Sequence, residues 1–425
     1  MIRGLISDWG NVLMRTVDIR PRMAWERRLG LSPGALADAF FGSELWDQAQ
    51  RGDTSVNDVW ADIARRLNLD GSDLSVLRRD FWAGDRLDEE LVALLREVRA
   101  LGLKTGLLSN HPTNLRRLLA KQGLMALFDA VVISAEEGLM KPDPAIYRLA
   151  LERLGLAPEE TVFVDDWRPN VEAAQALGMT GIHFRGTLHL RRALIAAGLP
   201  LRLPKLGPIP GIRAVIFDWG GVLSPLSFLQ RAPEWESRLG LPEGTVNAAL
   251  WGEKWKLLEI GSISREEYDA HVARTLGMDQ EALRAFYREY FAEDSLNPRI
   301  VAAIRALRGQ YKVALLTNAF PEHADVLRKR YGFDPRVEFD LYVNSAEVGL
   351  AKPDPAIYRL TLDRLGVRPE EAVFIDDHLR NTDAARMLGI HTIVFTDTET
   401  ALADLEALLG HPIGESDLSG TSKRA

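Results

Sequence analysis

The feature that most constrains this 425-residue chain is that its sequence repeats itself. Four segments return in the same order, at offsets between 208 and 211 residues. Their polar residues are Asp8 and Asp218, Ser109-Asn110 and Thr317-Asn318, Lys141 and Lys352, and Asp165-Asp166 and Asp376-Asp377. Each copy runs to about 200 residues, which is too long for a solenoid repeat and typical of a whole domain. The sequence therefore predicts two homologous domains in one chain.

The stretch between the copies predicts where the domains divide. Residues 199–211 contain four prolines, which fix the backbone and remove hydrogen-bond donors, so they predict a stiff, extended linker. We expect the first domain at residues 1–198 and the second at 212–410. The tail at 411–425 lacks apolar periodicity and is predicted to be disordered.

Within each copy, short apolar runs alternate with helical patterns. In the first copy the runs at residues 5–6, 105–108, 130–133, 161–164 and 181–184 predict strands, and 89–101, 113–122, 144–154 and 171–177 predict helices. In the second copy, residues 215–217 and 313–316 predict the matching strands. Such alternation indicates a parallel sheet covered on both faces. The fold class is α/β, with two tandem Rossmann-like cores. Helical patterns without a convincing strand predict a small all-helical insertion at about 15–85 and again at about 225–295.

Composition excludes several classes of function. The chain has 52 Lys and Arg against 60 Asp and Glu, a net charge of −8, which argues against nucleic acid as a partner. It has no cysteine, so a disulfide framework, a thiolate metal site and a cysteine nucleophile are all excluded. No apolar run approaches the roughly 20 residues of a membrane helix. The N-terminus lacks the layout of a signal peptide, and we expect a cytoplasmic protein with no membrane partner.

The repeated polar residues follow predicted strands, and ligands of open α/β sheets bind beyond the carboxyl ends of the strands. A lone Asp in such a place is usually a turn former or a helix cap, and a lone Lys is usually a solvated surface residue. A full set of Asp, hydroxyl, Lys and Asp pair that occurs twice instead favours phosphoryl transfer. A carboxylate can form an aspartyl-phosphate, further carboxylates can hold Mg²⁺, and a hydroxyl and a Lys can bind phosphoryl oxygens.

The four segments resemble the motifs of the haloacid dehalogenase superfamily, and the resemblance covers nearly the whole chain twice. It implies that Asp8 and Asp218 are nucleophiles that also bind metal, and that Lys141 and Lys352 hold the nucleophile and the phosphoryl group. Phosphate would be bound by Ser109, Thr317 and the backbone of Asn110 and Asn318. Mg²⁺ would be bound by Asp166 and Asp377, with Asp165 and Asp376 in support. The helical insertion resembles the family's small cap, which closes over the site.

One departure from the family pattern concerns proton transfer. In most phosphatases of this family, the second residue after the nucleophile is another Asp, which serves as general acid and base. Here it is Gly10 in the first copy and Gly220 in the second. Their backbone carbonyls could still bind Mg²⁺. An Asp-x-Gly-Asn/Gly-Val pattern also resembles the branch of bacterial sugar-phosphate phosphatases, whose anomeric phosphate is a better leaving group than a plain alcohol phosphate.

The predicted function is hydrolysis of a small phosphorylated metabolite, such as a sugar phosphate, by a Mg²⁺-dependent phosphatase. The main alternative is a phosphate-binding or scaffold protein with weak or no turnover, which Gly10 and Gly220 favour. A haloacid dehalogenase is the weaker alternative, because both copies keep the metal-binding Asp pair. The sequence leaves open whether the two copies pack as an internal pseudo-dimer.

Overall fold

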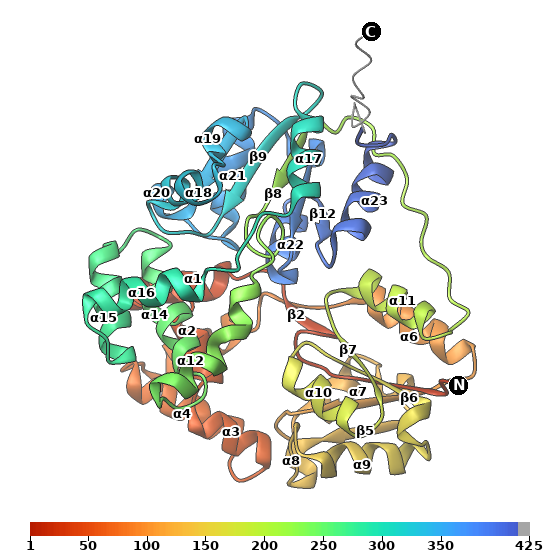
Figure 1. Cartoon of the computed structure of the whole chain (residues 1–425). Coiled ribbons are helices and arrows are strands. Elements are labelled where there is room, and N and C mark those ends of the chain that lie inside the picture. The colour runs from red at the N-terminus through yellow and green to blue at the C-terminus, as the bar shows by residue number, and fades with distance from the viewer. Residues whose placement is uncertain (415–425) are drawn as a thin grey trace. The chain divides into compact units, whose positions relative to one another are not determined.

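The computed structural model describes residues 1–414, and its chain divides into two units, Met1–Pro204 and Lys205–Ala425 (Figure 1). Each unit contains a parallel five-stranded sheet, which confirms the predicted fold class. In the first unit the strand order is β5-β4-β1-β6-β7, and in the second it is β10-β9-β8-β11-β12. The domain bounds predicted from the sequence stay a prediction.

The strands of the first sheet are β1 (Gly4–Ser7), β4 (Lys104–Ser109), β5 (Ala130–Ile133), β6 (Thr161–Asp165) and β7 (Thr180–His183). Those of the second are β8 (Ala214–Phe217), β9 (Lys312–Thr317), β10 (Leu341–Asn344), β11 (Ala372–Asp376) and β12 (His391–Val394). In both units the first strand in the chain is the central strand. Its neighbours, β4 and β6 or β9 and β11, end beside it because all three are parallel.

Helices cover both faces of each sheet. In the first unit they are α6 (Glu89–Ala100), α7 (Leu115–Lys121), α8 (Ser134–Glu137), α9 (Pro144–Leu154), α10 (Arg168–Ala176) and α11 (Thr187–Ala196). In the second unit they are α17 (Pro298–Leu307), α18 (His323–Tyr331), α19 (Pro335–Glu338), α20 (Ser345–Val348), α21 (Pro355–Leu365), α22 (Leu379–Arg386) and α23 (Thr398–Leu409).

The alternation of side chains along β8 shows why both faces need cover. Val215 and Phe217 pack in one cluster with residues of α17 and α23. Ala214 and Ile216 point to the other face and pack with residues of α21 and α22. Because successive side chains of a strand face opposite ways, a strand that is apolar at every position must be buried on both sides.

The helical insertion follows the first strand of each unit, as predicted. In the first unit it contains α1 (Arg20–Leu29), α2 (Ala35–Phe41), α3 (Glu44–Arg51), α4 (Val56–Arg66) and α5 (Gly71–Phe81). In the second it contains the 3₁₀ helix η3 (Ser227–Arg231) and α12 (Ala232–Leu239), α13 (Thr245–Trp251), α14 (Glu253–Leu258), α15 (Arg265–Leu276) and α16 (Gln280–Tyr290). Each insertion, called the cap below, has its own aromatic-rich apolar cluster.

Two details of the fold differ from the sequence-based expectation. The first cap is joined to its core by an antiparallel pair of short strands, β2 (Met14–Thr16) and β3 (Asp85–Leu87), which the apolar pattern does not reveal. In the predicted tail, His411 hydrogen-bonds the Tyr311 hydroxyl (2.7 Å) and Ile413 packs against the core, while residues 415–425 lie outside the described residues. None of the helices in the described part of the chain is long and apolar enough to cross a membrane.

Candidate active sites

The predicted site residues of each unit lie together because three neighbouring strands end at one edge of the sheet. In the first unit Asp8 follows β1, Ser109 ends β4 and Asp165 ends β6. We call these residues, with Lys141 and Asp166, the first site. The second site has the same construction: Asp218 follows β8, Thr317 ends β9 and Asp376 ends β11, with Lys352 and Asp377 completing the set. The strand order alone therefore explains why segments far apart in sequence meet.

A buried lysine joins two carboxylates in each site. Lys141 Nζ lies 2.9 Å from Asp8 Oδ1 and 2.6 Å from Asp165 Oδ2. Burial alone would lower the pKa of Lys141, but the negative charges of Asp8 and Asp165 outweigh it and raise that pKa above its usual value. In the second site Lys352 Nζ lies 2.6 Å from Asp218 Oδ1 and 2.7 Å from Asp376 Oδ2. Both lysines are therefore fixed cations.

Each lysine is held by the asparagine that follows the phosphate-binding hydroxyl. The Asn110 amide donates to the Lys141 carbonyl (2.8 Å), and the Lys141 backbone N–H donates back to Asn110 Oδ1 (2.8 Å). Asn318 makes the same pair of bonds with Lys352 (2.9 and 2.8 Å). The side chains of Asn110 and Asn318 are thus used to position the lysines. The phosphate-binding role predicted for these residues would fall to their backbone.

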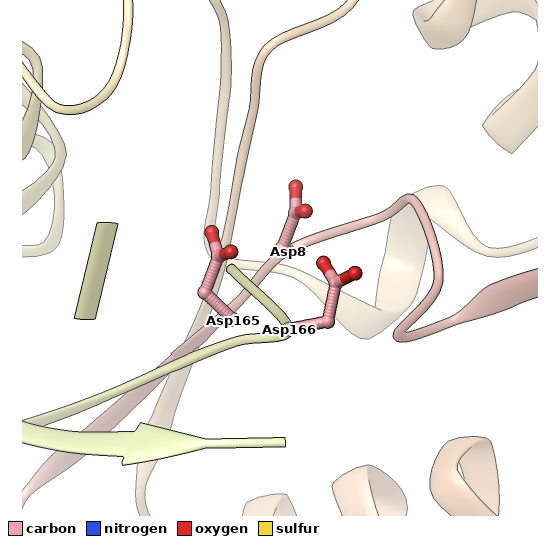
Figure 2. A group of neighbouring side chains, drawn as sticks. All are labelled: Asp8, Asp165 and Asp166. Atoms are coloured by element: carbon pink, nitrogen blue, oxygen red, sulfur yellow. The ribbon is translucent and has the colours of Figure 1, made fainter. Parts of the chain in front are cut away.

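Three carboxyl groups meet in each site, and their donor chemistry fits a divalent cation. Asp8, Asp165 and Asp166 each offer an oxygen atom, all within 4.8 Å of one another, and Figure 2 shows the three side chains projecting from neighbouring strand ends. Asp218, Asp376 and Asp377 form the equivalent group. One lysine cannot neutralise three carboxylates, and Mg²⁺ prefers such oxygen ligands. These residues therefore fit Mg²⁺.

Burial and the repulsion between neighbouring negative charges raise the pKa values of several of these carboxyl groups. Burial raises the pKa of Asp166 to about 7, with further contributions from the negative charges of Asp8 and Asp165. Burial likewise raises the pKa of Asp165, against the opposing charge of Lys141. In the second site, burial raises the pKa of Asp218 well above its usual range despite Lys352. A cation bound among these acids would favour their charged forms.

A second asparagine in each site, which the predicted site did not include, orients the buried aspartate. Asn170 Nδ2 donates to Asp165 Oδ2 (3.0 Å), and the Trp167 backbone N–H donates to Asp165 Oδ1 (2.8 Å). Asn381 and the backbone of His378 hold Asp376 in the same way (3.0 and 2.8 Å). The sequence signal was the return of Asn at the same spacing after each Asp pair.

The cap contacts the first site, as its resemblance to the family's cap implies, and the residue that makes the contact is one the predicted site did not include. In the first unit Gln50, on α3, donates from Nε2 to the carbonyl of Asn110 (3.0 Å). The Gln50 carbonyl accepts a hydrogen bond from Ser134 Oγ (2.5 Å), whose oxygen also accepts from the His111 backbone (2.9 Å). Gly52 makes this approach possible, since a Cβ there would lie 2.5 Å from the Ala135 carbonyl oxygen.

Two Rossmann-like cores each present carboxylates and a lysine at their strand ends, which is where open parallel sheets bind their ligands. The chain belongs to the haloacid dehalogenase-like hydrolases, because the model of that family matches residues 3–178 and 212–389. This match confirms the resemblance inferred from the four repeated segments, and it confirms that the protein is an enzyme.

Curated relatives match about half of this chain. The sesquiterpene phosphatase astK of Aspergillus oryzae is 34% identical over 187 residues, 44% of this chain and 91% of that protein. Acyl-CoA dehydrogenase family member 10 of Mus musculus is 36% identical over 213 residues, 47% of this chain and 19% of that protein. Bifunctional epoxide hydrolase 2 of Sus scrofa is 31% identical over 216 residues, 47% of this chain and 39% of that protein. The chain therefore spans less than half the length of the last two relatives.

Among solved structures, one that matches is the enzyme bt-2542 of Bacteroides thetaiotaomicron, determined in complex with magnesium and inorganic phosphate. It is 26% identical, and the alignment covers 44% of this chain and 95% of that one, with a TM-score of 0.38.

Proposed function

We propose that both sites are Mg²⁺-dependent phosphatase sites that hydrolyse a small phosphorylated metabolite through an aspartyl-phosphate. The observation that carries this proposal is the lysine-bridged group of three carboxylates, which the chain builds twice at the same strand ends. The likeness to a sesquiterpene phosphatase supports it, since that relative is matched over 91% of its length. The substrate and the cytoplasmic location stay predictions.

In the proposed mechanism, a carboxylate oxygen of Asp8 attacks phosphorus and displaces the leaving alcohol. Lys141 holds Asp8 in place and offers positive charge to the phosphoryl oxygens, and Ser109 binds a further oxygen. Bound Mg²⁺ would neutralise charge on the phosphoryl group, held by Asp8, Asp166 and the Gly10 carbonyl with Asp165 in support. Water then hydrolyses the aspartyl-phosphate. Asp218, Lys352, Thr317, Gly220, Asp376 and Asp377 would act likewise in the second site.

A second candidate function is phosphate binding without appreciable turnover. It is favoured by Gly10 and Gly220, which leave no carboxyl two residues after the nucleophile. Loss of general acid–base catalysis costs about 10²–10⁴-fold in rate. A haloacid dehalogenase is disfavoured, because Asp166 and Asp377 complete carboxylate groups suited to a cation.

The test is to replace each nucleophile by its isosteric amide. Asp8→Asn, Asp218→Asn and the double variant are assayed with 4-nitrophenyl phosphate and a panel of sugar phosphates in the presence of Mg²⁺. We expect each single variant to lose the contribution of one site and the double variant to fall to background. Hydrolysis that survives in the double variant would refute the proposal. A wild-type protein that binds phosphate and Mg²⁺ without turnover would support the binding function instead.

A further inference from the structure

The second site lacks an obvious group to move protons. Asp218 is the nucleophile, and Gly220 has no side chain to offer. Lys352 cannot act as the acid–base residue near neutral pH. Burial alone would lower its pKa, but the negative charges of Asp218 and Asp376 outweigh that effect and raise the pKa. A phosphate ester of a plain alcohol needs a proton on its leaving oxygen, so some other group is required.

The cap brings one carboxylic acid toward this site. Glu259 directly follows α14 and lies two residues before Gly261. A Cβ at Gly261 would lie 2.6 Å from the Ala346 carbonyl oxygen, so this glycine lets the cap segment approach α20 closely. Ser345, the first residue of α20, accepts a hydrogen bond from the Ala319 backbone (2.9 Å). Ala319 directly follows Thr317 and Asn318, so the cap segment lies against the phosphate-binding loop.

The first unit shows where a side chain at this position reaches. Gln50 stands two residues before Gly52, as Glu259 stands two residues before Gly261, and both glycines meet the short helix that follows a core strand. The Gln50 side chain ends 3.0 Å from the carbonyl of Asn110, beside Ser109. The tryptophan four residues before each position also makes an edge-to-face contact with the loop after the phosphate-binding segment, Trp46 with His111 and Trp255 with Phe320.

The surroundings of Glu259 suit a proton carrier. Burial raises the pKa of this carboxyl to about 7. A hydrogen bond from the Trp255 side chain and the positive charges of Lys352, Lys256 and Arg380 act in the opposite direction. Lys352 belongs to the second site, and Arg380 lies three residues after Asp377. A carboxyl of this kind is present in both protonation states near neutral pH, as an acid–base catalyst requires.

We infer that Glu259 is the acid–base residue of the second site and stands in for the aspartate that Gly220 replaces; this inference rests on the proposed phosphatase function. As Asp218 bonds to phosphorus, the bond from phosphorus to the leaving oxygen breaks and that oxygen takes the proton of Glu259. The Glu259 carboxylate then takes a proton from water as the water oxygen bonds to phosphorus. The bond to Asp218 breaks, its electron pair returns to the Asp218 carboxylate, and Glu259 is protonated again.

The first site cannot work in this way, because the amide of Gln50 is neither an acid nor a base near neutral pH. The two sites therefore divide by leaving group. The second site hydrolyses phosphates of plain alcohols, whereas the first is limited to esters with good leaving groups.

The test uses Glu259→Gln, which copies the residue of the first unit, in a full-length chain with Asp8→Asn so that the second site is measured alone. We expect kcat on an alkyl phosphate to fall by about 10²–10⁴-fold. With 4-nitrophenyl phosphate, whose leaving group needs no proton, we expect a burst of one nitrophenolate per chain followed by slow turnover. The matched control is Glu253→Gln, the same change at an exposed position of α14.

The reciprocal variant, Gln50→Glu with Asp218→Asn, should raise first-site hydrolysis of the alkyl phosphate by at least about tenfold. This gain does not depend on how well Glu259→Gln folds. Equal losses on both esters without a burst, or no loss at all, would overturn the inference and leave the phosphatase function standing. If the chain with Asp8→Asn alone hydrolyses neither ester, both the function of the second site and this inference fail.

Discussion

The first and second sites share one arrangement of catalytic groups and differ in what surrounds it. The lysine contacts the nucleophile and the buried aspartate in both units, with Lys–Asp distances between 2.6 and 2.9 Å. The neighbouring positions differ. They are Asn11 and Gly221, Gln50 and Glu259, His111 and Ala319, and Trp167 and His378.

This difference shows which parts of the site the fold itself maintains. The shared groups stand at strand ends or are fixed by hydrogen bonds to the backbone, so sheet geometry determines their positions. The residues that differ lie on the loops and the cap segment, and their change leaves the sheet intact. Divergence at these positions is how two copies of one fold would acquire different substrates. The shared groups should therefore respond alike to substitution in the two units, and the residues on the loops and the cap segment should not.

The largest effect is expected where the sites are most alike. Lys141→Met leaves Asp8 and Asp165 buried without their cation, which should lower the free energy of unfolding of the first unit by about 3–5 kcal/mol at neutral pH. Lys352→Met should do the same in the second unit. The loss should shrink toward acid pH, because protonation then removes the unpaired negative charge of the buried carboxylates. Urea unfolding followed by circular dichroism measures it.

The controls are Lys121→Met and Lys329→Met, at exposed positions of the first and second unit. Both should leave unfolding nearly unchanged. A loss below about 1 kcal/mol for either buried lysine, the usual range of exposed ion pairs, would show that the lysine–carboxylate contacts are not desolvated as described.

The next largest effect tests the missing acid. Gly10→Asp places a carboxyl two residues after the nucleophile, where a Cβ meets no atom within 4 Å and the φ angle lies outside the left-handed region. With Asp218→Asn to silence the second site, we expect kcat/KM on an alkyl phosphate to rise about 10²-fold. Gly220→Asp, measured with Asp8→Asn, should raise kcat/KM much less, because Glu259 already acts as the acid–base residue of the second site. Equal increases in kcat/KM for the two variants would show that the second site lacks an acid–base residue as the first site does.

A smaller effect follows from the pKa of Asp166, which burial and the charges of Asp8 and Asp165 raise to about 7. Mg²⁺ binds the charged carboxylate, so below pH 7 a proton must leave first. We expect the Mg²⁺ affinity of the first site to be flat above pH 7 and to fall about tenfold per pH unit below it. Titration calorimetry with Asp377→Asn, which weakens the second site, tests this. Constant affinity between pH 8 and 5.5 would contradict it.

The sequence was sufficient to predict the arrangement of groups that the two sites share. Parallel strands place residues such as Asp8 and Asp165 at one edge, and the repeat showed that the pattern is not accidental. What the sequence did not reveal depends on tertiary packing. Gln50 reaches Asn110 because Gly52 lets the cap approach α8, and no local pattern encodes that approach. Strands β2 and β3 were missed because three residues are too short to show the alternation of a strand.

The smallest effect concerns the loop after the nucleophile. Asn11 and Gly221 both have positive φ, 53° and 70°. Only Asn11 carries a side chain, and its Nδ2 donates to Asp166 Oδ2 (3.0 Å), which favours the charged form of that carboxyl. We therefore expect Asn11→Gly, which copies the second unit, to weaken Mg²⁺ binding about fivefold at pH 7 through loss of about 1 kcal/mol. Glycine adopts left-handed backbone freely, so backbone strain in the variant cannot explain the change.

The reciprocal variant separates this hydrogen bond from the fit of the loop. In the second unit a Cβ at Gly221 would collide with the carboxylate of Asp377. Gly221→Asn should therefore weaken Mg²⁺ binding as well, and no gain should follow from adding the amide. If Gly221→Asn instead strengthened binding to the level of the first site, the two loops would be interchangeable. The difference between the sites would then lie in the cap alone.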